Sequence, residues 1–200
     1  MRKQLQTRTL AIVLLLVVVP AMAIVPTTAM AQTQPRIGNT VVVNQGETVN
    51  GDLAATARTI IVRGTVTGDL RANARNIVIA RTGTVQGDVA VNSQNLNIAG
   101  TVGEDVESES QFLTIGGTVK GDVKTRSQEL VIGKSATVKG EVESAAEDVV
   151  LAGTVNEDVR TLSGTLTVTK TARLGGDLVY TATTFNREPG SKIAGTVRHD

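Results

Sequence analysis

The stretch Gly64-Thr65-Val66-Thr67-Gly68-Asp69-Leu70 decides the fold, because close copies of it recur along most of the chain. The clearest copies begin at Gly83 and Gly117. The central apolar residue returns after 17 or 19 residues, with a last step of 23. It falls at nine positions: Val49, Val66, Val85, Val102, Val119, Val138, Val155, Leu174 and Val197. Self-similarity at a short, nearly fixed period predicts a solenoid.

Further columns of similar residues follow each central residue at fixed distances. An apolar residue comes four positions later, a small residue eight positions later and a large apolar residue eleven positions later. Coil length varies by two residues, and only just before the next copy. Side chains alternate along a strand, so a change of two residues keeps inward positions inward. This parity indicates strands.

The repeat therefore predicts an all-β chain that folds as a parallel β-helix. A period of 17–19 residues with three apolar stretches fits a coil of three short strands, and the copies make eight to nine coils. Glycines before the acidic position predict bends with unusual backbone angles. These glycines are Gly51, Gly68, Gly87, Gly121, Gly140 and Gly176.

The start of the chain has the layout of a secretory signal peptide. Arg2, Lys3 and Arg8 precede an unbroken apolar run over residues 10–19. Residues 1–31 are interpreted as the signal, and residues 10–25 approach the length of a membrane span, so an uncleaved anchor is the alternative.

Two small-residue triplets follow the apolar run, and the second of them is Ala29-Met30-Ala31. Cleavage is expected after Ala31, with Ala29 and Ala31 as the small residues that precede the cut. Residues 32–40 would then form a linker, and residues 41–200 the β-helix, with an irregular last coil at 183–195.

The composition excludes several classes of function. The chain has no cysteine and no tryptophan, and His199 is its single histidine. The residues needed for disulfides, Cys-based zinc sites and most nucleophile–base pairs are therefore absent. No catalytic residue, cofactor or metal is expected. Without the three basic residues of the signal, 17 basic residues face 19 acidic ones, so net charge gives no argument for a nucleic-acid partner.

An acidic residue stands three positions after most central residues. The column is Asp52, Asp69, Asp88, Asp105, Asp122, Glu141, Asp158 and Asp177. Ca²⁺ between coils would relieve the repulsion of stacked carboxylates. The favoured interpretation is ordinary turn chemistry, in which the Asp side chain accepts a backbone N–H. The threonine before each central residue is interpreted as a solvated strand position, and His199 as a solvated tail residue.

These repeats resemble those of the bactofilin family, whose domain is a run of Val-x-Gly-Asp-Val/Ile coils. The similarity covers about residues 37–182 and is clearest at residues 66–70, 85–89 and 119–123. The resemblance implies a right-handed, triangular β-helix. It also implies end-to-end assembly into non-polar filaments without nucleotide, often at membranes, where family members position cell-envelope enzymes. The signal segment and the last coil, with Arg187 and Pro189, depart from the family pattern.

Self-assembly is also expected from the residues themselves. A β-helix has two ends with unpaired backbone and apolar core, and no capping segment is evident in this sequence. Another copy of the chain can add its edge strand to such an end. The contacts are predicted at the terminal core columns: Val41, Val43, Val49, Leu174, Leu178 and Val197.

The sequence thus predicts a non-enzymatic, polymer-forming structural protein that is exported, extracytoplasmic and membrane-associated, and that acts as a scaffold at the cell envelope. The expected partners are further copies of the chain, the membrane surface and envelope enzymes, with no nucleic acid and no nucleotide. One alternative is an extracellular solenoid adhesin or carbohydrate-binding protein, which would have to work without aromatic platforms. A β-helix enzyme is less favoured, because the corners offer no long loops to build a substrate groove.

Overall fold

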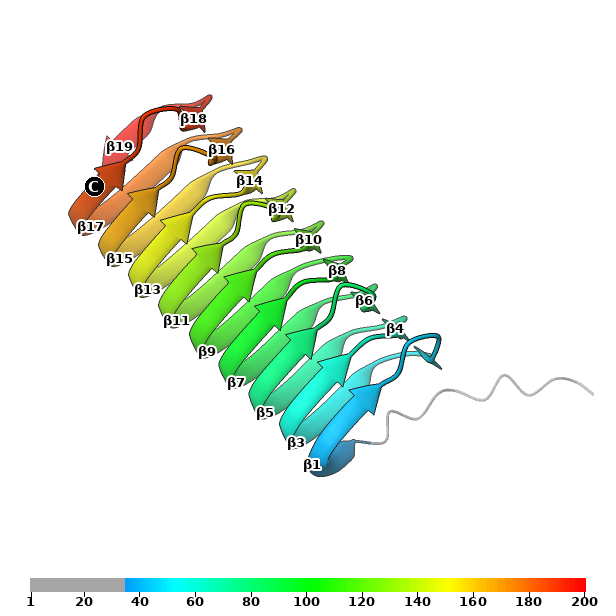
Figure 1. Ribbon diagram of the computed structural model, residues 1–200. Coiled ribbons are helices and arrows are strands. Elements are labelled where there is room, and N and C mark those ends of the chain that lie inside the picture. Colours follow the sequence, from blue (N-terminus) through cyan, green and yellow to red (C-terminus); the bar gives the residue numbers. More distant parts are fainter. Residues whose placement is uncertain (1–34) are drawn as a thin grey trace, which may run out of the picture. The chain divides into compact units, whose positions relative to one another are not determined.

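Each turn of the repeat consists of one long strand and one two-residue strand. A computed structural model of the protein describes residues 35–200, which form a parallel β-solenoid without a helix (Figure 1). The all-β prediction is confirmed, with about nine turns. Residues 1–31, with the predicted cleavage site at Ala29 and Ala31, lie outside the described part of the chain. None of residues 35–200 belongs to a helix that could cross a membrane.

Two parallel sheets run along the solenoid. One contains the nine longest strands and the last one: β1 (Arg36–Val43), β3 (Leu53–Val62), β5 (Leu70–Ile79), β7 (Val89–Ile98), β9 (Val106–Ile115), β11 (Val123–Ile132), β13 (Val142–Leu151), β15 (Val159–Val168), β17 (Leu178–Arg187) and β19 (Val197–His199). The other contains the two-residue strands: β2 (Thr48–Val49), β4 (Thr65–Val66), β6 (Thr84–Val85), β8 (Thr101–Val102), β10 (Thr118–Val119), β12 (Thr137–Val138), β14 (Thr154–Val155), β16 (Arg173–Leu174) and β18 (Lys192–Ile193).

The long strands bend in the middle, so two of the three predicted strands of each coil are one continuous strand. Between β3 and β5 the ladder pairs Ala57 with Ala74 and Thr59 with Asn76, and it omits Arg58. The same position is omitted in every following coil, and Figure 1 shows the bends stacked along one edge of the solenoid. The small column lies at this bend. The outward residues at and beside the bend are called the bend ridge below.

The core is a set of columns in which similar side chains stack on one another. Ile60 of β3 pairs with Ile77 of β5, and both side chains are fully buried. Adjacent strands of a sheet lie about 4.8 Å apart, so each coil covers the apolar side chains of the one before it. Interior coils are therefore buried from both sides, and only the two end coils are not.

The two-residue insertions form turns that sit on the shorter coil before them. In the 80–83 turn, Gly83 donates its N–H to the Ala80 carbonyl (2.8 Å). The inserted Thr82 donates its hydroxyl to the carbonyl of Arg63 (2.9 Å), one coil earlier. Ser135 and Thr171 make equivalent bonds to preceding coils. The insertion thus satisfies a carbonyl that a short corner leaves free.

In the later coils, buried hydroxyl groups line the inner side of the long strands before their bend. Ser108 and Thr125 share a hydrogen bond of 2.9 Å, and Ser144 donates to Thr161 at 2.8 Å. The corresponding position in the first coils is occupied by alanine, as at Ala55. Paired hydroxyls can replace apolar groups in a core because each one has its partner in the next coil.

The register of the last coil corrects one prediction. Leu174 pairs with Ile193 in the sheet of short strands, whereas Val197 pairs with Leu178 in the other sheet. The assignment of Val197 to the Val49 column was therefore wrong. In residues 183–195 the backbone keeps its register, and Arg187 stands opposite Val168. The departure from the repeat there lies in the side chains.

Candidate assembly surfaces and polar columns

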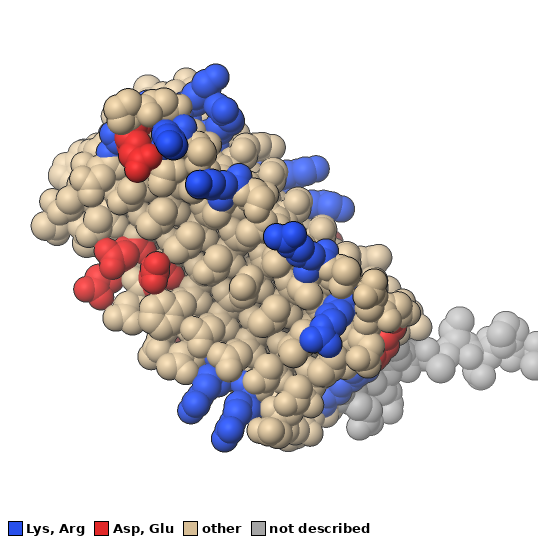
Figure 2. Space-filling model, in the orientation of Figure 1, with Lys and Arg blue, Asp and Glu red and all other residues tan. Residues whose placement is uncertain are grey.

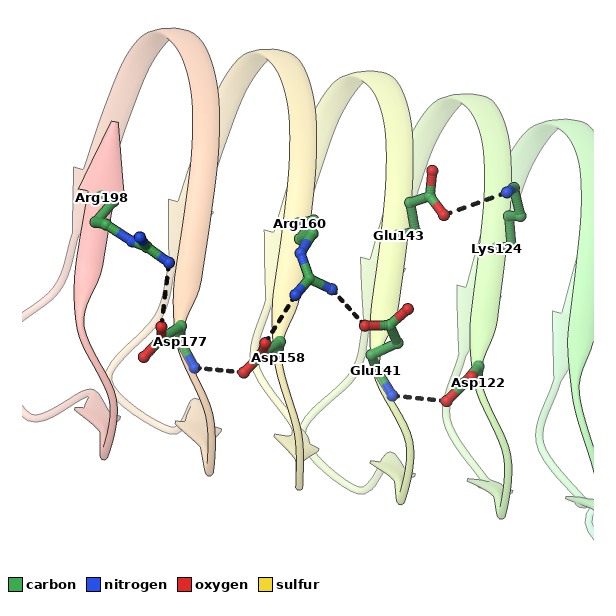
Figure 3. Close-up of polar contacts among 8 residues, drawn as sticks. All are labelled: Asp122, Lys124, Glu141, Glu143, Asp158, Arg160, Asp177 and Arg198. Carbon is green, nitrogen blue, oxygen red and sulfur yellow. Dashed lines mark hydrogen bonds and ion pairs between the residues drawn. The ribbon is translucent and has the colours of Figure 1, made fainter. Parts of the chain in front are cut away.

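The acidic column forms a ladder between coils that is interrupted only at Glu141 within residues 35–200. Oδ1 of each aspartate accepts the backbone N–H of the residue that holds the same place in the next coil, as between Asp69 and Asp88 (3.0 Å). Figure 3 shows this pattern from Asp122 to Glu141 (2.9 Å) and from Asp158 to Asp177 (2.8 Å). The predicted role as acceptor of a backbone N–H is confirmed, with the donor one coil further on. Within residues 35–200, no group of three or more acidic or histidine residues could hold a metal ion.

This ladder explains the glycine before six of the eight acids, and the explanation differs from the predicted one. Among the six glycines of this position, Gly51 alone has a positive φ (89°), so the expected unusual backbone angles are wrong for the other five. A Cβ built on Gly68 would overlap Oδ1 of Asp52 in the preceding coil. Gly87 and Gly140 meet the aspartate before them in the same way. Glycine is favoured because the carboxylate of the neighbouring coil occupies the space of a side chain, although Glu104 and Glu157 hold this position in two coils.

Arginine side chains extend the ladder near its later end. Arg160 pairs with Glu141, which stands in the aspartate position, and with Asp158 Oδ2 (3.0 Å) (Figure 3). The hydrogen bond to Glu141 raises the pKa of Arg160. In the last coil the backbone N–H of Thr196 donates to Asp177 Oδ1 (2.7 Å) and lowers the pKa of that carboxyl, to which Arg198 adds a smaller lowering.

A shallow groove of about 370 Å³ runs from β9 to β17 on the outer side of the long strands, before their bend. Its charged side chains compensate one another within the chain. Lys124 pairs with Glu143 at 3.3 Å, and Arg126 pairs with Glu109 at 3.4 Å. The basic side chains of the groove, Lys124, Arg126 and Arg160, thus all have acidic partners.

The β1 end of the described solenoid is crossed by an ion pair. Arg36 lies opposite the inward-facing Ala55, and its guanidinium reaches Glu47 Oε1 (3.4 Å) at another corner of the coil. The backbone N–H of Asn44 donates to Glu47 Oε2 (2.9 Å) and is the main reason why the pKa of Glu47 is lowered. Val43 is fully buried although β1 is an edge strand.

The other end of the solenoid is built from larger apolar side chains. The Tyr180 and Phe185 rings lie 4.3 Å apart, and His199 lies 5.1 Å from Tyr180. His199 is exposed, as expected, but it is part of β19 and pairs with Tyr180. Phe185 and Ile193 are half-buried, and Val197 is 38% exposed.

The predicted contact residues divide into buried and accessible ones. Val41, Val43, Leu174 and Leu178 are buried within the chain, whereas Val49 is half-buried and Val197 exposed. The residues that sequence reasoning missed are Arg36, Glu47, Tyr180, Phe185 and Ile193. Phe185 and Tyr180 occupy inward columns of the last complete coil, so the repeat register could have indicated them.

These features define a class: a structural β-solenoid with open strand edges, whose polar columns serve backbone hydrogen bonding. A family model described as Bactofilin, polymer-forming cytoskeletal, matches residues 40–112 and 102–198. The chain belongs to this family. It is thus a non-enzymatic structural polymer that associates with copies of itself. Neither a curated protein nor a solved structure matched the chain.

Proposed function

We propose that this bactofilin is exported, assembles through the two ends of its solenoid, and serves as a scaffold at the cell envelope. Within this scaffold its partners are further copies of the chain, the membrane surface and envelope enzymes. The single observation that carries the proposal is that, within residues 35–200, both ends of the solenoid have strand edges without a pairing strand. β1 and β19 are the outermost strands of one sheet, and β2 and β18 those of the other.

The β17–β19 end supplies the apolar part of the contact. β19 covers β17 only at residues 178–180, so the rest of β17, including Phe185, has an unpaired edge. Unpaired strand edges next to apolar side chains favour strand addition by another chain. Val197, Ile193 and Phe185 are thus the contact residues at this end, whereas the deeper Leu174 and Leu178 support them.

Export is supported by the sequence of residues 1–31. The basic residues Arg2, Lys3 and Arg8 followed by an apolar run and small residues are typical of a signal peptide. The positive flank stays inside and the solenoid is delivered to the outer side, whether the segment is cleaved or retained. A retained segment would hold the polymer at the membrane, whereas cleavage would release it into the extracytoplasmic space.

Two measurements test the proposal. Electron microscopy of the purified full-length protein should show filaments, and a monodisperse single subunit at high concentration would overturn end-to-end assembly. In the host cell, external protease should reach the solenoid once the outer barrier is opened, and mass spectrometry should find the mature chain starting at Gln32 if the signal is cleaved. Complete protection of the solenoid inside intact membranes would overturn export while leaving the polymer untouched.

A further inference from the structure

The bend ridge carries five charged residues that form no ion pair within residues 35–200, whereas Glu109 and Arg126, which also lie beside the bend, pair with each other. Arg58 and Arg75 lie on β3 and β5, and both are exposed. Glu129 lies on β11, and Glu147 and Asp148 lie on β13. The eight ion pairs of residues 35–200 include none of these five residues. The five residues thus differ from Lys124, Arg126 and Arg160 of the groove, each of which forms an ion pair.

The signs of these charges are separated along the ridge. The basic side chains stand near the β1 end and the acidic ones nearer to β17, with the neutral Gln94 and Gln111 between them. Figure 2 shows a basic and an acidic group at separate places along the edge where the long strands bend. A single acidic partner would use only the basic half of such a surface, whereas a surface of both signs is complementary to itself when reversed.

Exposed apolar side chains lie on the same ridge. Among residues 35–200 four large apolar residues are exposed, and three of them are on the ridge: Ile37 (79%), Phe112 (40%) and Leu162 (59%). Ile37 pairs with Thr56, and Leu162 pairs with Ala145, which place both at the same position of their coils. Large exposed apolar side chains grouped on one surface mark an interaction site.

The strand order gives the register of such a contact. In the order β1, β3, β5, β7, β9, β11, β13, β15, the midpoint lies between β7 and β9. A two-fold axis at this midpoint, perpendicular to the solenoid, exchanges β1 with β15, β3 with β13 and β5 with β11. Ile37 then meets Leu162 of the second copy, Arg58 meets Glu147 and Asp148, and Arg75 meets Glu129. Gln94 meets Gln111, and Phe112 lies next to the axis.

We propose that the bend ridge is a lateral interface on which a second copy of this chain docks side by side in the antiparallel direction. One register brings Ile37 onto Leu162 and the unpaired arginines onto the unpaired acids, while Arg126 stays paired with Glu109 of its own chain. The contact is isologous, so the same surface serves both copies. It uses outward side chains and leaves the strand edges of β1 and β19 free, so it is independent of end-to-end assembly.

Cysteine cross-linking of the full-length protein tests the direction and the register. The chain has no cysteine of its own, so every disulfide comes from introduced residues. Ile37 and Leu162 of one chain are seven strands apart, about 34 Å at the usual strand spacing, too far for an internal disulfide. The double variant Ile37→Cys/Leu162→Cys should form a covalent dimer on mild oxidation, and each single variant should not. No dimer from the double variant, or dimers from the single variants, would overturn the proposal.

Charge reversal in this double-cysteine background tests the chemistry of the contact. Arg58→Glu/Arg75→Glu should lower the yield of covalent dimer at least tenfold, and adding Glu129→Arg, Glu147→Arg and Asp148→Arg should restore it. The matched control Arg63→Glu/Arg81→Glu makes the same change of charge at the other corner and should leave the yield unchanged. Equal yields from all these variants would overturn the proposed pairing. Circular dichroism of each variant confirms that the solenoid is folded.

The same experiment in a Val197→Lys background separates the ridge from the ends. The covalent dimer should persist when end-to-end assembly is blocked, because the ridge spans β1 to β15 and excludes β19. Loss of the dimer together with the filaments would show that the cross-link reports the ends, and it would overturn the lateral interface.

Discussion

The two ends of the solenoid come from the same repeat, yet their terminal coils are covered in different ways. At the β1 end, Arg36 and Glu47 form an ion pair across the coil, and Val43 beneath it is fully buried. At the other end, Tyr180 and Phe185 are half-buried, and Val197 is exposed.

This difference indicates which end would bury more apolar surface when another copy binds. Burial of accessible apolar surface favours association in proportion to the area removed from water. The β17–β19 end still has such surface at Phe185, Ile193 and Val197, whereas at the β1 end Val41 and Val43 are already buried and Val49 is half-buried. We therefore expect the β17–β19 end to contribute more to assembly, and the following four predictions test this.

The largest effect is expected from Val197→Lys. A lysine charge buried without a partner in an apolar contact costs several kcal/mol, and each ~1.4 kcal/mol lowers an association constant about tenfold. Filaments should disappear in electron microscopy while the circular dichroism spectrum stays that of a β protein. Thr114→Lys, on an exposed position of the central strand β9, adds the same charge and should leave filaments intact. Normal filaments from Val197→Lys would remove this residue from the contact.

The same substitution at the other end, Val49→Lys, should have a smaller effect. Val49 is half-buried in the first coil, close in sequence to the Glu47 carboxylate, and the β1 end is already partly polar. Filaments should be shorter but present in the length distribution from electron microscopy. An equally complete loss would mean that the β1 end is bound as tightly as the β17–β19 end, and the contrast between the ends would fail.

Arg36→Ala should loosen the first coil without unfolding the solenoid. Both partners of the Arg36–Glu47 pair are more than 30% exposed, so the pair contributes no more than about 1 kcal/mol after screening by solvent. Hydrogen exchange of the β1 amides should become faster, by up to about fivefold, and exchange in β9 should not change. Glu47→Gln keeps the size of the side chain and removes its charge, so it should give the same direction of change. Unchanged β1 exchange in both variants would show that the ion pair does not stabilise the first coil.

Acid should affect the two end coils by a small and similar amount. Glu47 and Asp177 both have a lowered pKa in the folded chain, compared with ordinary values of 4.5 and 3.8. The stabilisation is therefore complete above these ordinary values and is lost as the pH falls through the folded-state pKa. Hydrogen exchange of β1 and β19, corrected for intrinsic rates, should rise relative to β9 between pH 5 and pH 3. A uniform change along the whole solenoid would contradict this.

The columns of the repeat could be predicted from the sequence because they depend on parity and spacing alone. Ile60 and Ile77 are seventeen residues apart in the sequence and stack directly in the sheet. The aspartate as an acceptor of backbone N–H groups was also predictable, because that chemistry is local to the side chain.

The errors arose where the reason for a residue lies in a neighbouring coil. Gly195-Thr196-Val197 has the same letters as the start of the repeat, but its hydrogen bonds place it four residues further along the coil. The glycine of Gly68-Asp69 is set by the carboxylate of Asp52, which a local reading of the sequence does not include. Arg36 was missed because it stands in an inward position that is open only in an edge coil.

The aspartate ladder makes each coil an exchangeable unit, because every rung needs only the same residue one coil away. Removing residues 103–119, or duplicating them, would rejoin one Val column to the next and keep the aspartate acceptors in register, at the cost of side-chain pairs such as Ser108–Thr125. The length of the solenoid could then change in steps of about 4.8 Å. A protein of this design can serve as a molecular ruler, and the number of its repeats would set the spacing of whatever is attached along the filament.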